Sequence, residues 1–154
     1  MPSAWRIVRA GRAGTAFSGE GARHSGGRWS SPGARMVYLS EHQSTAALEI
    51  FVHTVPFPIS EIYKAFRVEW ADSLTEIFPL KQLPANWRDS IPPPEATEIG
   101  DRWVRERRSA VLAVPSALSP DDRNFLLNPE HPDFKRIRIA APINYEFDPR
   151  LLGR

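Results

Sequence analysis

The segment Ala46-Ala47-Leu48-Glu49-Ile50-Phe51-Val52 contains one carboxylate among six apolar residues. It lies in a stretch from Ser44 to Thr54 that predicts a helix, with Ser44 as its N-cap and Pro56 and Pro58 beyond its end. Carboxylates are rarely buried without a partner. Either the helix turns Glu49 toward solvent beside Thr45 and His53, or it directs Glu49 into a site where a carboxylate stabilises positive charge or acts as a base.

Short apolar segments on both sides of this helix predict strands, and a second helix is predicted over residues 95–108. Ala96, Ile99 and Trp103 form an apolar stripe along that helix at spacings of three and four. Three segments predict loops or turn-rich connections, namely 10–35, 83–94 and 121–134. The predicted strands are residues 5–9, 36–40, 61–70, 73–78 and 110–114, with a strand pair or one bent strand over 135–147. The expected fold is α+β, with many short strands and two main helices.

The length and composition favour a single soluble domain. A chain of 154 residues with 42% hydrophobic and 25% charged residues is typical of one globular unit, here 1–154. The chain has no cysteine, which excludes disulfides and thiolate chemistry. Neither a signal peptide nor a membrane-spanning segment is evident. We therefore expect a cytoplasmic protein that does not bind a membrane.

The net charge of +2 and the pI of about 9.3 come mainly from arginine. Such a balance reflects either a general preference for arginine or a site for a phosphorylated ligand. The basic charge also makes nucleic acid a candidate partner. A cluster of arginines between residues 102 and 108 is interleaved with Glu98, Asp101 and Glu106, which favours a solvated helix face over a nucleic-acid surface. Direct nucleic-acid binding is therefore not expected.

Two further stretches contain candidate site residues. In Gly26-Gly27-Arg28-Trp29-Ser30, the glycines allow close backbone approach and Arg28 can grip a phosphate, although the same residues suit a plain turn. Ser116 follows a predicted strand, where serine after proline is also ordinary turn chemistry. The four histidines are scattered singly, so no metal site is expected.

The order of these features resembles the RES domain family. That family is named for an arginine, a glutamate and a serine, and Arg28, Glu49 and Ser116 match those positions. The motifs that carry the resemblance are residues 26–30, 37–40, 46–49 and 114–116, followed by 122–129, 131–134 and 147–151. The resemblance covers nearly the whole chain.

The resemblance implies a compact fold like that of the ADP-ribosyltransferase toxins, built around an NAD⁺ cleft. It implies a toxin of a toxin–antitoxin pair that cleaves the nicotinamide–ribose bond of NAD⁺, with water or phosphate as acceptor and no bound cofactor. The implied partner is an Xre-like DNA-binding antitoxin, in a dimer or larger complex. Three alternatives stay open: an ADP-ribosyltransferase that modifies a protein, an RNA-directed toxin, and a non-catalytic interaction module.

The same resemblance implies a role for each site residue. The Glu49 carboxylate would stabilise the ribose as it becomes cationic, and Arg28 would bind the pyrophosphate or an attacking phosphate. Tyr38 would stack on the nicotinamide ring or fix its geometry. Ser116 would form a hydrogen bond with the substrate or with Glu49.

Overall fold

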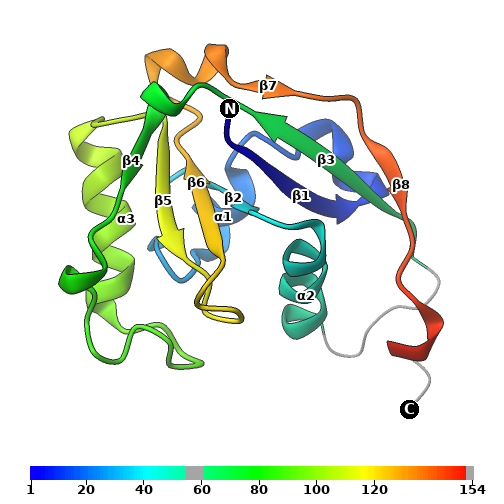
Figure 1. Ribbon diagram of the computed structural model, residues 1–154, viewed down its shortest axis with the longest axis horizontal. Helices are drawn as coiled ribbons and strands as arrows, with labels where there is room; N and C mark the ends of the chain where they lie inside the picture. The colour runs from blue at the N-terminus through cyan, green and yellow to red at the C-terminus, as the bar shows by residue number, and fades with distance from the viewer. Residues whose placement is uncertain (55–60, 152–154) are drawn as a thin grey trace.

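The computed structural model describes residues 1–54 and 61–151, and in this part of the chain eight strands form one sheet (Figure 1). The sheet has the order β4-β5-β6-β2-β1-β3-β7, and β8 also pairs with β3. All pairs are antiparallel except β4 with β5. The strands are β1 Ser3–Arg9, β2 Val37–Ser40, β3 Tyr63–Glu69, β4 Thr75–Ile77, β5 Val111–Pro115, β6 Arg123–Leu127, β7 Arg138–Ile139 and β8 Ile143–Tyr145.

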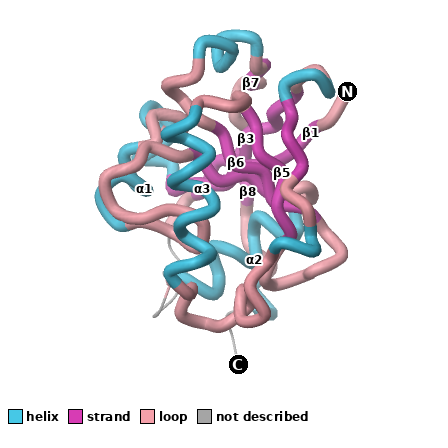
Figure 2. The backbone as a smooth tube through the Cα atoms, turned by 90° about the vertical axis from the view of Figure 1, so that its left-hand side faces the viewer, coloured by secondary structure: helices cyan, strands magenta, loops and turns pink. Residues whose placement is uncertain are grey.

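Two longer helices pack on the sheet, as predicted. Helix α2 (Gln43–His53) lies against β1 and β2, and α3 (Pro94–Glu106) runs beside β5, as Figures 1 and 2 show. A short helix, α1 (Glu20–Ser25), precedes β2. Five 3₁₀ turns occupy 10–15, 72–74, 80–82, 132–136 and 149–151. The α+β prediction is therefore confirmed, and no helix in the described residues is long and apolar enough to cross a membrane.

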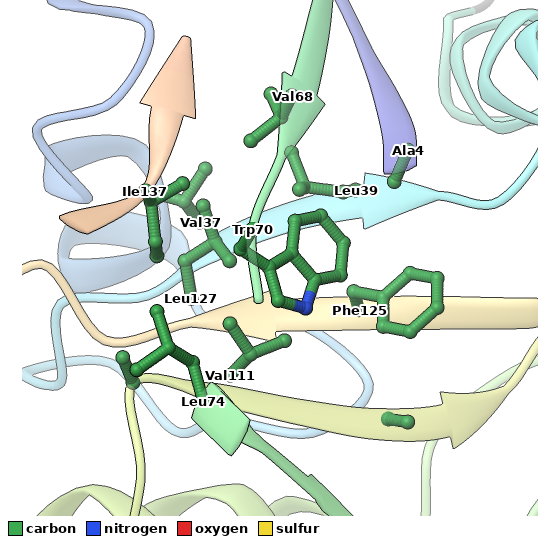
Figure 3. Packing of buried hydrophobic residues seen from close by; sticks show 12 residues of the cluster. Ala4, Val37, Leu39, Val68, Trp70, Leu74, Val111, Phe125, Leu127 and Ile137 are labelled. Carbon is green, nitrogen blue, oxygen red and sulfur yellow. The ribbon is translucent and has the colours of Figure 1, made fainter. Parts of the chain in front are cut away.

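Three apolar clusters hold the layers together. The first surrounds the fully buried Trp70 and includes Leu39 and Phe125, whose ring stands edge-on to Trp70 with centroids 5.0 Å apart (Figure 3). The second lies between α3 and the sheet and is built around Trp29 and Trp103. The third lies beneath α2, where small residues let the helix approach the sheet closely: Ala46 and Ala47 pack with Ile7, Tyr63 and Ala65.

Strand β6 corrects the prediction of a turn-rich connection over residues 121–134. It lies between β5 and β2 in the middle of the sheet. Both of its faces are covered, because Phe125 and Leu127 belong to the first cluster and Leu126 to the second. A strand that is buried on both faces shows no alternation of polar and apolar residues. The sequence of β6 therefore lacks the periodicity from which a strand is predicted.

Two corrections concern helix boundaries. Residues 10–35 were expected to be a long loop, but they contain a 3₁₀ turn and α1. The N-cap of α2 is His42 rather than Ser44, and the His42 side chain makes no capping hydrogen bond. The hydroxyl of Thr45 instead donates to Asp122 Oδ2 at 3.1 Å, which joins the first turn of α2 to the segment before β6. Pro56 and Pro58 lie outside the described residues.

Candidate functional site

Helix α2 places Glu49 over the sheet, and two of its apolar residues are more exposed to solvent than this carboxylate. The side chain of Glu49 is 29% exposed, whereas Leu48 and Val52 are 45% and 47% exposed. Asn124 on β6 donates from Nδ2 to Glu49 Oε1 at 3.2 Å. One turn earlier, Thr45 is buried, so the face that bears Thr45 and Glu49 points toward the protein. Glu49 is therefore partly exposed beside His53 and partly covered by the sheet, and its role in a site stays a prediction.

Arg28 lies in a tight turn between α1 and β2. Gly26 has φ 71°, a conformation that suits glycine, and Gly27 and Ser30 pair through their backbones. Arg28 Nη1 donates to the carbonyl oxygens of Trp87 and Asp89 at 2.8 and 2.7 Å. Among residues 1–54 and 61–151, its Nε and Nη2 groups have no hydrogen-bond partner, and no carboxylate forms an ion pair with it. One edge of the guanidinium is thus available to an anion.

The hydroxyl of Tyr38 anchors this turn. It accepts a hydrogen bond from Trp29 N at 3.2 Å and lies 2.7 Å from Ser30 Oγ. Gly27 leaves room for this contact, because a Cβ there would meet the Tyr38 oxygen at 2.5 Å. Desolvation raises the pKa of Tyr38 to about 12, so its phenol stays neutral at physiological pH. Stacking of the ring on nicotinamide stays a prediction.

Helix α3 fixes the other side of the turn. Asp101 accepts the backbone N–H of Ser31 at 2.9 Å. Gly100 lies so close to the Trp29 carbonyl that a Cβ would overlap it. Within the chain, Gly27 and Gly100 thus serve the packing of the turn against β2 and α3, and close approach of the turn to a ligand stays a prediction.

Ser116 directly follows β5 and is fully buried. Its Oγ accepts the backbone N–H groups of Leu118 and Ser119, each at 3.2 Å, so the hydroxyl caps the turn between β5 and β6. The side chain that contacts Glu49 is Asn124, on the neighbouring strand. A hydrogen bond from Ser116 to the substrate stays a prediction.

The segment from Trp87 to Asp89 joins the Arg28 turn to the Ser116 turn. The ring of Trp87 stacks on that of Trp29, with centroids 6.0 Å apart. Arg88 Nε donates to the carbonyl of Ala117, next to Ser116, at 3.0 Å. Like Arg28, Arg88 forms no ion pair with any carboxylate among residues 1–54 and 61–151. The sequence predicts only a connection over residues 83–94, so the contacts of Trp87 and Arg88 follow from the tertiary structure alone.

The charges of these residues act on one another. Desolvation lowers the pKa of Arg28, while the negative charges of Glu49 and Asp89 raise it and the positive charge of Arg88 lowers it. On α2, contact with Glu49 raises the pKa of His53, whose Nε2 lies 3.6 Å from Glu49 Oε2. Arg28, Glu49 and Arg88 therefore share one electrostatic environment, although they come from three separate segments.

A second polar group lies near the start of α2. One ligand atom each of Glu41, His42 and Asp122 lies within 4.8 Å of the others, close enough to surround a cation. Both carboxylates already accept protein hydrogen bonds, Glu41 from the N–H of Arg123 and Asp122 from Thr45. Glu41 and His42 also line a pocket of about 810 Å³ that none of the predicted site residues lines.

Three of the four arginines between residues 102 and 108 form ion pairs within the protein. Arg102 pairs with Glu106, Arg105 with Glu98, and Arg108 with both Glu76 and Glu106. These pairs confirm the prediction of a solvated, salt-bridged helix face. They contrast with Arg28 and Arg88, which have backbone carbonyl partners only.

Comparison of the sequence with known protein families identifies one match. Residues 3–148 match the model of the RES domain. The chain belongs to the RES domain family. The match of Arg28, Glu49 and Ser116 to the family's arginine, glutamate and serine stays a prediction, and the charges of the first two act on each other in the structure.

Curated relatives in the RES family cover the full length of the chain. "Toxin Res" of Yersinia enterocolitica is 34% identical over 148 residues, which cover 96% of this chain and 97% of that protein. The "Prs ADP-ribosylating toxin" of a Sphingobium species is 32% identical over 157 residues, which cover 99% and 98%. On these relationships the chain is a RES-type toxin.

A solved structure has the same fold. The Mycobacterium tuberculosis MbcT–MbcA toxin–antitoxin complex contains a chain that superposes with a TM-score of 0.76. The match covers 98% of this chain and 86% of that one, at 17% sequence identity. At this sequence identity the two chains have few identical residues, so the comparison shows a common fold and nothing more.

Proposed function

We propose that this RES-type toxin cleaves the bond between nicotinamide and ribose in NAD⁺. The proposal rests on one juxtaposition: the half-buried carboxylate of Glu49 shares its electrostatic environment with the guanidinium of Arg28, which has no carboxylate partner among residues 1–54 and 61–151. A carboxylate suits a ribose that becomes cationic, and a guanidinium suits the anionic diphosphate of the same molecule. Membership in a family with an ADP-ribosylating relative supports the same substrate.

In the proposed reaction, the C–N bond to nicotinamide breaks and its electron pair leaves with the nicotinamide nitrogen. Nicotinamide departs as a neutral molecule, so no strong general acid is needed. Water or inorganic phosphate then forms a C–O bond at the same ribose carbon and loses a proton. Glu49 lowers the barrier because its negative charge is stabilising chiefly while the ribose is cationic.

Arg28 and Arg88 are the proposed diphosphate ligands. Arg28 offers its Nε and Nη2 groups as a fork for two phosphate oxygens, while its Nη1 group keeps its carbonyl partners. The charge of Arg88 acts on that of Arg28, and the Arg88 side chain is held by a contact with Ala117 that uses only Nε. No metal or prosthetic group is part of this proposal.

Release of nicotinamide is the direct test. Purified protein incubated with NAD⁺ should release nicotinamide in a chromatographic assay. The assay is run in phosphate-free buffer and again with added phosphate. ADP-ribose as the co-product identifies water as the acceptor, whereas a phosphorylated ADP-ribose identifies phosphate. Failure of the folded, partner-free protein to release nicotinamide under either condition would contradict the proposal.

Transfer of ADP-ribose to a protein is the second candidate, because the Sphingobium relative is named as an ADP-ribosylating toxin. The same bond breaks, but a protein side chain replaces water. Incubation of a cell extract with NAD⁺ labelled in its adenylate part distinguishes the two functions. Label that appears on protein bands only with active enzyme favours transfer, and label found only in small products favours cleavage.

We further propose that an antitoxin controls the activity. The structural relative is a toxin–antitoxin complex, and unrestrained loss of cytoplasmic NAD⁺ would harm the producing cell. An Xre-like DNA-binding protein is the partner that the family resemblance implies, in a dimeric or larger assembly. An acidic side chain or chain terminus placed against Arg28 would block the diphosphate site.

A further inference from the structure

We propose that Asn124 is a positioning residue that holds the Glu49 carboxylate in its reactive orientation. This inference rests on the proposed function, because it assigns Asn124 to the same site. Asn124 lies on β6 in the middle of the sheet, opposite Ser40 of β2 and Val114 of β5. Its side chain reaches Glu49 from the sheet, while the carboxylate comes from α2.

The contact fixes one carboxylate oxygen and leaves the other free for chemistry. Asn124 Nδ2 donates to Oε1 at 3.2 Å, whereas Oε2 faces His53 at 3.6 Å. The ring of His53 is largely exposed and can move aside. A glutamate has several rotatable bonds, so one hydrogen bond from a buried strand residue restricts where its charge can lie.

The amide of Asn124 carries a cost to stability that packing does not explain. The residue is only 8% exposed, and its Oδ1 is buried without a hydrogen-bond partner. Buried polar atoms are normally satisfied, so an unsatisfied oxygen in a central strand calls for a compensating role. Rotation of the amide by 180° would place Oδ1 against the carboxylate oxygen, so the observed orientation is the one that keeps the donor on Glu49.

A residue of similar size without the amide would suit the fold at least as well. The three residues that follow Asn124 on β6, Phe125 to Leu127, are apolar and buried. An apolar side chain removes the unsatisfied oxygen and gains burial. Asn124 is thus expected to lower stability in return for the placement of Glu49, which is a pattern found at functional sites.

The test compares Asn124→Leu with a matched control, Asn128→Leu. Asn128 is also buried, but its Oδ1 accepts the backbone N–H of Glu130 at 3.0 Å and it has no contact with Glu49. Asn124→Leu should keep or raise Tm and lower kcat for nicotinamide release by up to about 100-fold, with little change in KM. Asn128→Leu should lower Tm and leave kcat of the folded protein unchanged.

A third variant, Asn124→Asp, gives a readout that a structural role would not produce. Two carboxylates side by side share one proton, so the variant should be nearly inactive at neutral pH. Protonation of the new carboxyl restores a donor toward Glu49, and activity should partly return as the pH falls. Arg28 and Arg88, which share the electrostatic environment of Glu49, and His53 beside it are the same in both proteins.

The positioning role of Asn124 can be tested even if the proposed NAD⁺ cleavage is wrong. If the wild-type protein releases no nicotinamide, the contact itself is followed through the side-chain amide signals of Asn124 in a nitrogen–proton NMR spectrum. Loss of the carboxylate acceptor in Glu49→Gln should shift those signals relative to wild type. Unchanged Asn124 amide signals in Glu49→Gln, or an Asn124→Leu variant with wild-type kcat, would overturn the positioning role.

Discussion

Arg28 donates from a single nitrogen, Nη1, to the carbonyl oxygen of Trp87 at 2.8 Å and to that of Asp89 at 2.7 Å. These two hydrogen bonds join the turn that bears Arg28 to the segment 87–89. Because the acceptors are backbone carbonyls, no carboxylate neutralises the guanidinium there. The charges of Glu49 and Arg88 act on the same guanidinium. This arrangement gives Arg28 two separable tasks, one in the protein and one toward a ligand.

Replacement of Glu49 by glutamine should abolish turnover without unfolding the protein. The neutral side chain keeps its size but loses the charge that opposes the ribosyl cation, a change that typically lowers the rate about 10²–10³-fold. Glu69→Gln is the control, since its side chain has a similar exposure of 31% and pairs with Arg67 instead. Near wild-type nicotinamide release by Glu49→Gln would remove Glu49 from the mechanism.

Arg28→Lys should fail although it preserves the charge. A lysine ammonium cannot bridge the carbonyls of Trp87 and Asp89 and also present a planar fork to phosphate. We expect KM for NAD⁺ to rise about tenfold or more, which corresponds to at least ~1.4 kcal/mol of binding. Arg12→Lys, on an exposed turn, is the control. Unchanged kinetics at low NAD⁺ concentration would show that Arg28 has only a structural role and does not bind the substrate.

Arg88→Gln should weaken the binding of diphosphates selectively. The affinity for ADP-ribose, measured by calorimetry, should fall several-fold, whereas inhibition by nicotinamide should stay the same because nicotinamide carries no phosphate. Arg138→Gln on β7 is the matched control, as Arg138 is also exposed and forms no ion pair among residues 1–54 and 61–151. Equal effects of the two substitutions would point to long-range charge rather than a binding contact.

The ring of His53 should titrate above the usual value for histidine, which is about 6.5. Contact with Glu49 raises its pKa in the folded state. The contribution to stability is therefore present below the unfolded pKa and lost as the pH rises through the folded pKa. It should be small, because the ring is largely exposed. An NMR titration checks this, and Glu49→Gln should return the pKa toward the ordinary value while the other histidines titrate as before.

Partner binding and NAD⁺ binding should exclude each other. If the antitoxin places an anionic group against Arg28, saturating amounts of an uncleavable NAD⁺ analogue should weaken its apparent affinity. By linkage, the antitoxin should weaken binding of the analogue by the same factor. The measurement is antitoxin affinity at rising analogue concentration. An affinity that stays flat would indicate inhibition at a remote surface.

Local patterns in the sequence were sufficient for several elements. The alternation in residues 5–9 predicts β1, and the apolar stripe of α3 predicts a helix whose Ala96 and Trp103 are buried. Short motifs, through their resemblance to the family, also predict Arg28 and Glu49 as site residues. Such features depend on neighbours along the chain, so the order of residues suffices to find them.

Tertiary structure decided what these residues contact. The sequence does not reveal that β6 lies in the middle of the sheet, because its two faces are covered by segments distant in the chain. Asn124 therefore meets Glu49 across 75 residues, and Arg28 meets Trp87 across 59. A side chain's partner depends on how helices and strands pack, and the free energy of that packing is spread over the whole core. The chain alone thus names the carboxylate and the guanidinium, and only the fold gives each its partner.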